Sequence, residues 1–195
     1  MVDQTWRPAA APPESLEAGP VRLHRWRADD AEDLYAAVIA SQRHLAPFLP
    51  WAHDYDRSRT TVYLGDSQRW WTERAAFNYR VAAPDLLPGR VLGSVGLMAR
   101  RGPGILEIGY WLHVDAVGRG LAVRSVAALT GAAMALPGVE VIWICHVPEN
   151  AASAAIPARL GFTRQAEPVE GPPGFEHERD VCWTLSRKDG VPVRG

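Results

Sequence analysis

The sequence predicts one α/β domain in which a central mixed β-sheet is flanked by helices on both faces. Three observations support this prediction. The 195 residues suit a single domain with a sizeable core. Segments with alternating apolar residues are interleaved with segments of helical periodicity. No internal repeat or linker divides the chain, and its 47 % hydrophobic and 22 % charged residues are typical of a globular protein.

The first half of the chain predicts a helical region followed by antiparallel hairpins. Residues 1–20 are rich in Ala, Pro and Glu without periodicity, and we interpret them as a mobile arm. The domain proper is expected over residues 21–186, followed by a tail at residues 187–195. Strands are expected at residues 21–26, 77–84 and 91–99, and helices after Asp29 or Asp30 and over residues 58–76.

The central feature is a strand that leads into a glycine turn and a helix. Residues 106–114 alternate with the period of two that is typical of a β-strand. Gly118 and Gly120 follow, and a helical pattern runs from Leu121 to about residue 136. Glycines let the backbone approach a ligand, and the first N–H groups and the dipole of a helix attract anions. The stretch predicts an anionic, phosphorylated ligand; alternatively, the glycines only form a tight connection.

The remaining chain predicts a further strand–helix–strand unit. Residues 139–147 are nearly all apolar, as in an interior strand. Asn150 can cap a helix that ends at Gly161. A short strand from residue 162, a Pro/Gly/Glu loop at residues 167–174 and a last strand at residues 178–185 complete the prediction.

Composition argues against several classes of partner. The formal net charge of −1 disfavours general binding to nucleic acid or anionic membranes. No apolar run approaches the roughly 20 residues of a membrane span, and the N-terminus lacks the order of a signal peptide. Cys145 and Cys182 lie in apolar runs, and two buried thiols fit a reducing cytosol better than a disulfide scaffold. We therefore expect a cytoplasmic protein without a nucleic-acid or membrane partner.

Other site chemistries do not match the spacing of residues. Cys145 and His146 are adjacent in a strand, so their side chains point to opposite faces and cannot form a nucleophile–base pair. The histidines show no metal-ligand spacing with the cysteines, and no metal is expected. Gly120 is not followed by the Lys and hydroxyl residue of a P-loop, and Val123 stands where a dinucleotide fold needs Gly or Ala.

The order of elements, together with three stretches, resembles the GNAT superfamily of acyl-coenzyme A N-acyltransferases. The stretches are Val21-Arg-Leu, Glu107-Ile-Gly-Tyr-Trp-Leu with Gly118-Arg-Gly-Leu-Ala122, and Asn150-Ala-Ala-Ser153 through Arg159-Leu-Gly-Phe162. Within the superfamily they are most similar to the RimJ/RimL type, which acetylates N-terminal amines of ribosomal proteins. The resemblance covers about residues 20–186. It implies a GNAT-like, mostly antiparallel mixed sheet, acetyl-CoA as the cofactor and, from the resemblance alone, a homodimer.

The resemblance assigns coenzyme A binding to the glycine turn and to the helix led by Asn150. An N–H near Leu112 or His113 would polarise the thioester. Val117 departs from the Arg or Gln usual in the family, and Ile156 and Pro157 replace the Tyr that many relatives use as a proton donor. The expected cofactor-binding residues are Leu112, His113, Val114, Val117, Gly118, Arg119, Gly120, Leu121, Ala122, Arg124, Asn150 and Ser153.

Acyl transfer to an amine needs a proton acceptor, a hydrogen-bond donor to the oxyanion and a group that stabilises the leaving thiolate. Glu107 is the candidate proton acceptor, with an ordinary salt-bridged strand residue as the alternative. Ser153 could donate to the thiolate or only satisfy its own helix turn. Glu107, Trp51 and Trp70 are the expected substrate contacts, because carboxylates and aromatic faces suit a cationic amine; alternatively, the tryptophans are core residues.

The sequence therefore predicts an acetyl-CoA-dependent N-acetyltransferase that works by direct attack in a ternary complex. Its acceptor would be a primary amine, either a protein or peptide N-terminus or a small amine such as an antibiotic. Two alternatives stay open: a non-catalytic acyl-CoA-binding module, and a Rossmann-like nucleotide-binding domain.

Overall fold

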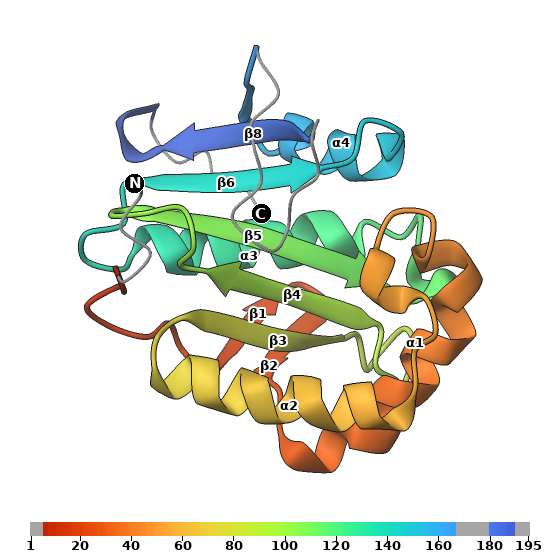
Figure 1. Cartoon of the computed structure of the whole chain (residues 1–195). Coiled ribbons are helices and arrows are strands. Elements are labelled where there is room, and N and C mark those ends of the chain that lie inside the picture. Colours follow the sequence, from red (N-terminus) through yellow and green to blue (C-terminus); the bar gives the residue numbers. More distant parts are fainter. Residues whose placement is uncertain (1–5, 167–179, 190–195) are drawn as a thin grey trace.

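An eight-stranded mixed sheet with helices on both faces forms the protein in a computed structural model that describes residues 6–166 and 180–189 (Figure 1). The strand order is β1-β2-β3-β4-β5-β6-β8-β7, and the neighbouring strands are antiparallel except for the parallel pair β5 and β6. The bounds are β1 Ser15–Ala18, β2 Val21–Arg25, β3 Ala76–Ala82, β4 Gly93–Met98, β5 Ile105–Leu112, β6 Val141–His146, β7 Thr163–Arg164 and β8 Val181–Ser186. The predicted fold class is confirmed. The loop expected at residues 167–174 and the start of the expected last strand lie outside the described residues.

The helices cover the sheet in two layers. Those over one face precede β3, and those over the other face follow β5 (Figure 1). The bounds are α1 Ala31–Leu45, α2 Arg57–Thr72, α3 Leu121–Met134 and α4 Ala151–Arg159, with short 3-10 turns η1 Ala28–Asp30, η2 Pro50–Ala52, η3 Val114–Ala116 and η4 Arg187–Asp189. Successive side chains of β3 point to opposite faces of the sheet. Asn78 therefore donates to Ser67 of α2, whereas its neighbour Phe77 lies in the main core together with Leu129 of α3. Among the described residues, no helix has the length and apolar character needed to cross a bilayer.

The N-terminal segment is part of the sheet rather than a mobile arm through residue 20. β1 pairs with β2 in antiparallel register. Trp6 packs against the main core, and the Tyr79 hydroxyl donates to the Pro13 carbonyl at 2.7 Å. The backbone hydrogen bonds between paired strands do not require alternating apolar side chains. A short edge strand such as β1 is therefore not revealed by composition or periodicity.

β5 and β6 separate in the middle of the sheet (Figure 1). Their parallel register ends at the pair Glu107 and Trp143, although both strands continue for several residues. The N–H of His113 donates to the carbonyl of Leu92, on the β4 side of β5, at 2.8 Å. Because successive N–H groups of a strand point to opposite edges, the N–H of Leu112 faces the gap. Of the two amides expected to polarise a thioester, Leu112 is thus the one directed to the opening.

Cys145 of β6 and Cys182 of β8 form a disulfide bond. They occupy directly opposed positions of the antiparallel pair, with their Cα atoms 4.2 Å apart. The prediction of two free buried thiols is therefore wrong, because it considered each apolar run alone and not the register between them. The argument for a reducing compartment that rested on free thiols no longer holds.

Candidate functional site

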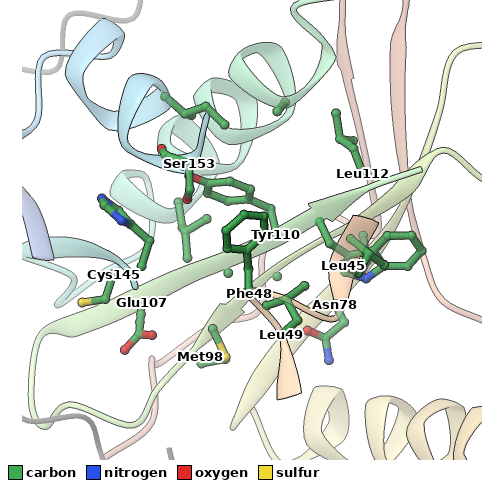
Figure 2. A pocket seen from close by; sticks show the side chains of 18 of the residues that line it. Leu45, Phe48, Leu49, Asn78, Met98, Glu107, Tyr110, Leu112, Cys145 and Ser153 are labelled. Atoms are coloured by element: carbon green, nitrogen blue, oxygen red, sulfur yellow. Dashed lines mark hydrogen bonds between the residues drawn. The ribbon is translucent and has the colours of Figure 1, made fainter. Parts of the chain in front are cut away.

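A cavity of about 1220 Å³ occupies the opening between β5 and β6 and extends over the sheet to the segment between α1 and α2. Figure 2 shows Phe48 and Leu49 of that segment, Met98 of β4, and Glu107 and Tyr110 of β5 around it. The glycine loop and the first turn of α4 also line it. The cavity therefore joins the two regions that the sequence assigned separately to a cofactor and to an acceptor.

The glycine loop presents open backbone to this cavity. Gly118 and Gly120 have φ values of 74° and 72°, the left-handed region that other residues rarely adopt. No atom lies within 4 Å of where a Cβ would stand at either glycine, so the surface is free for a ligand. Gly120 is the N-cap of α3, whose unpaired N–H groups and dipole suit phosphate oxygens. The cavity is also lined by Val117, Leu121 and Ala122, three of the positions at which the sequence predicts cofactor contacts.

Four other predicted cofactor residues are not among the residues that line the cavity. The His113 side chain is buried, and the Val114 N–H donates to the Ser41 hydroxyl at 3.1 Å. Arg119 is exposed and donates to a carbonyl of its own loop, while Arg124 reaches the turn between β1 and β2. With Val117 at the start of the loop, the backbone amides are the groups best placed to hold an anion.

Ser153 faces Tyr110 at the end of the cavity (Figure 2). The Asn150 side chain caps α4 by accepting from the Ser153 N–H at 3.0 Å. The Tyr110 hydroxyl donates to the Ser153 carbonyl at 3.1 Å and lies 2.9 Å from Ser153 Oγ. Burial raises the pKa of Tyr110 to about 12, against a smaller lowering from the hydrogen bond with Ser153. Sequence reasoning did not single out Tyr110, although the strand alternation and the carbonyl freed by Pro157 were both visible.

Glu107 is buried, with 4 % of its surface exposed, and its carboxylate forms ion pairs with Arg100 and Arg101. Arg101 also donates to Cys145 Sγ at 3.2 Å, and its guanidinium lies 4.9 Å from the centre of the Trp143 ring. Sequence reasoning missed both arginines, because residues 101–104 had only the signature of a turn and Arg100 carried no signal of its own. The carboxylate thus belongs to a charged cluster in the cavity wall.

The predicted aromatic acceptor residues belong to the helical layer that precedes β3, whereas the glycine loop opens α3 in the other layer. Trp51 is 37 % exposed and makes edge-to-face contacts with Tyr55 and Trp111, at ring-centre distances of 5.8 and 6.1 Å. Trp70 also lines the cavity. Its neighbour Trp71 is a core residue packed against β3. Aromatic side chains therefore gather around Trp51, which is the tryptophan of this group most open to a ligand.

Small residues of β4 and β5 form part of the cavity wall. Gly96 of β4 and Gly109 of β5 are directly opposed. A Cβ at Gly96 would lie 2.2 Å from Oδ1 of Asn78, so the glycine makes room for this amide. Asn78 Nδ2 donates to Ser67 at 3.1 Å, and this bond orients the side chain. The role of these residues depends on which strands are neighbours, and no local pattern indicates it.

The sequence matches the profile of the acetyltransferase (GNAT) domain over residues 21–163. The chain belongs to the GNAT acetyltransferase family. It is therefore an acetyltransferase with acetyl-CoA as its cosubstrate, as the motifs predicted. The site fits this substrate, because an open glycine loop at a helix N-terminus can hold phosphates and the gap beside β5 offers a backbone N–H.

Several solved structures of GNAT proteins share the fold. RimL, an α-N-acetyltransferase of ribosomal protein L7/L12 in complex with coenzyme A, has a TM-score of 0.76 and 19 % identity over 89 % of this chain and 98 % of that one. RimJ of Mycobacterium smegmatis has a TM-score of 0.73 and 19 % identity, over 90 % of this chain and 87 % of that one. The microcin C7 self-immunity acetyltransferase MccE, bound to acetyl-CoA and AMP, has a TM-score of 0.72 and 18 % identity, over 85 % of this chain and 92 % of that one. No curated protein sequence matches the chain significantly.

Proposed function

We propose that this GNAT enzyme transfers the acetyl group of acetyl-CoA to a primary amine by direct attack within one ternary complex. The observation that carries the proposal is one cavity lined both by the glycine loop and by Trp51 and Trp70. A thioester held by the glycine loop and an amine held by the aromatic side chains could meet over β5. The cysteine in the cavity wall, Cys145, is held in a disulfide and so offers no thiol for a covalent acetyl intermediate.

Three groups on or beside β5 would carry the reaction. Each oxygen of an ionised Glu107 can accept more than one hydrogen bond, so the ion pairs with arginine leave room for the amine proton, directly or through water. The Leu112 N–H would stabilise the oxyanion that develops on the thioester. The Ser153 hydroxyl would donate to the leaving thiolate.

The acceptor is proposed to be the N-terminus of a protein or peptide, with a small amine as the alternative. Aromatic faces at Trp51 and Trp70 can bind an ammonium group, and the amide oxygen of Asn78 can accept from it. The names of RimL and RimJ point the same way, although at 19 % identity they support the fold alone. A cytoplasmic location and a homodimer also stay predictions, tested by the redox state of Cys145 in cell extract and by the mass in solution.

Thermal shift and turnover together test the proposal. Acetyl-CoA at about 100 times its Kd stabilises a protein by about 2.7 kcal/mol, or roughly 5–10 °C here, while NAD and ATP should give no such shift. Release of coenzyme A is then measured with a peptide, with the same peptide blocked at its N-terminus, and with small amines. Turnover of the free peptide alone supports the proposal. Binding without turnover of any amine overturns it in favour of a binding module, and a larger shift with NAD or ATP would favour a nucleotide-binding domain.

A further inference from the structure

We infer that Tyr110 is a positioning residue, which holds Ser153 so that its hydroxyl can turn to the sulfur of coenzyme A. The inference deepens the proposed function and rests on it for the role of Ser153. It stands on the hydrogen bonds between β5 and the first turn of α4 and on the place of both residues in the cavity wall.

The need for Tyr110 arises from Pro157, which lies inside α4. Proline has no N–H, so the carbonyl of Ser153, four residues earlier, loses its usual helical donor. This carbonyl is partly buried, and a carbonyl removed from water without a donor is costly, so such groups in proteins are nearly always paired. The Tyr110 hydroxyl donates to this carbonyl at 3.1 Å. A strand residue thus supplies the bond that the helix itself cannot make.

The same contact sets the direction of the Ser153 hydroxyl. Tyrosine has a single O–H, and the Ser153 carbonyl accepts it. The 2.9 Å contact between the two hydroxyls therefore has Ser153 Oγ as the donor and Tyr110 as the acceptor. Because burial raises the pKa of Tyr110 to about 12, the phenol keeps its proton at neutral pH. Rotation of one hydroxyl torsion would redirect the Ser153 proton from Tyr110 to a sulfur in the cavity.

Ser153 is consequently fixed at three polar groups. Its N–H donates to Asn150, and its carbonyl and hydroxyl both contact Tyr110. Loss of Tyr110 would release the latter two while leaving the helix cap in place. The inference therefore predicts a defect in thiolate stabilisation with little change in how tightly acetyl-CoA binds.

The test compares Tyr110→Phe with Tyr79→Phe. Tyr79 is the matched control, because it lies on the same sheet face, is buried and also donates to a backbone carbonyl, but does not line the cavity. Both variants should melt several degrees lower. Only Tyr110→Phe should lower kcat, by about tenfold for one bond to a charged group, with KM for acetyl-CoA unchanged. The same variant should also raise the pKa of the thiol of bound coenzyme A, which is measured by following the thiolate absorbance as a function of pH.

Two double variants locate the effect. In a Ser153→Ala background, Tyr110→Phe should have no further effect on kcat or on the thiol pKa. In a Pro157→Ala background, the restored N–H can donate to the Ser153 carbonyl, so Tyr110→Phe should lower the melting temperature by less than half as much as in the wild type. An undiminished effect in either background overturns the inference.

Two further outcomes also overturn it: equal kcat, or an equal pKa of the bound thiol, in Tyr110→Phe and Tyr79→Phe. The thiol pKa and the melting temperatures need no amine. They decide on Tyr110 even if no acceptor is turned over, in which case the proposed function fails separately.

Discussion

Replacing Glu107 with Gln removes the negative charge from a buried cluster that contains two arginines. Glu107 is 4 % exposed and the Arg101 side chain 9 %, so water cannot easily replace the lost charge. Removing one partner of a buried pair costs about 3–5 kcal/mol. Arg100 is 22 % exposed and the Gln carbonyl can still accept one bond, which places the cost near about 3 kcal/mol. For a chain of this size the melting temperature should fall by about 6–12 °C.

The same substitution tests the proton acceptor. If the Glu107 carboxylate takes the amine proton, kcat/KM should fall about 10²- to 10⁴-fold at a temperature where the variant is folded. The Kd for acetyl-CoA should stay unchanged, because the loss lies in the chemical step. Glu140→Gln is the control, since its exposed contact with Arg187 is 3.9 Å long and worth less than about 1 kcal/mol.

Two results would refute this reasoning at different steps. An unchanged melting temperature would show that the charge on Glu107 does not balance the arginines. A large drop in melting temperature with kcat/KM within about threefold of the wild type would leave Glu107 as a salt-bridged wall residue and remove it from the mechanism.

Three further predictions follow from other parts of the structure. Reduction of the disulfide between Cys145 and Cys182, which are 37 residues apart, should lower the free energy of unfolding by about 4 kcal/mol and the melting temperature by about 8–16 °C. A melting temperature that does not change with reductant would contradict the presence of this disulfide. Gly96→Ala should displace the Asn78 amide and raise KM for the amine about threefold to tenfold at constant KM for acetyl-CoA, whereas equal changes in both would argue against an acceptor contact. Burial, aided by a neighbouring arginine, lowers the pKa of His113 below 6.5. The unfolded chain then binds the proton first, so the free energy of unfolding should decline as the pH falls from about 6.5 through the lowered pKa, and His113→Asn should flatten this decline in urea titrations.

The parts of the site that were predicted from sequence are those with local signals. Gly118 and Gly120 were recognised because a left-handed turn at the start of a helix selects glycine. Asn150 was recognised as a cap because its side chain bonds only three residues ahead. The alternation of β5 likewise indicated a strand without knowledge of its neighbours.

The parts that were missed depend on which side chains the pairing of strands and the geometry of turns bring together. Cys145 and Cys182 meet because β6 and β8 pair in one particular register, and a shift by one residue would put their side chains on opposite faces. Arg101 and Glu107 meet across a hairpin turn. Tyr110 reaches Ser153 only because α4 returns to the edge of β5. Of these three pairs, only Arg101 and Glu107 lie within one short window of sequence, and there the geometry of the turn decides that the side chains meet.

β5 offers its two faces and one free edge to different parts of the proposed reaction. Glu107 and Tyr110 are three residues apart, an odd separation that places their side chains on opposite faces of the sheet. Tyr110 faces α4, and in the proposed reaction this is the side of the thiolate, whereas Glu107 would face the amine. Where β6 leaves the strand, the Leu112 N–H at the edge lies between these faces. A thioester that passed through this gap would present its carbonyl to the edge, its sulfur to one face and its acetyl carbon to an amine on the other, which is the alignment that direct transfer requires.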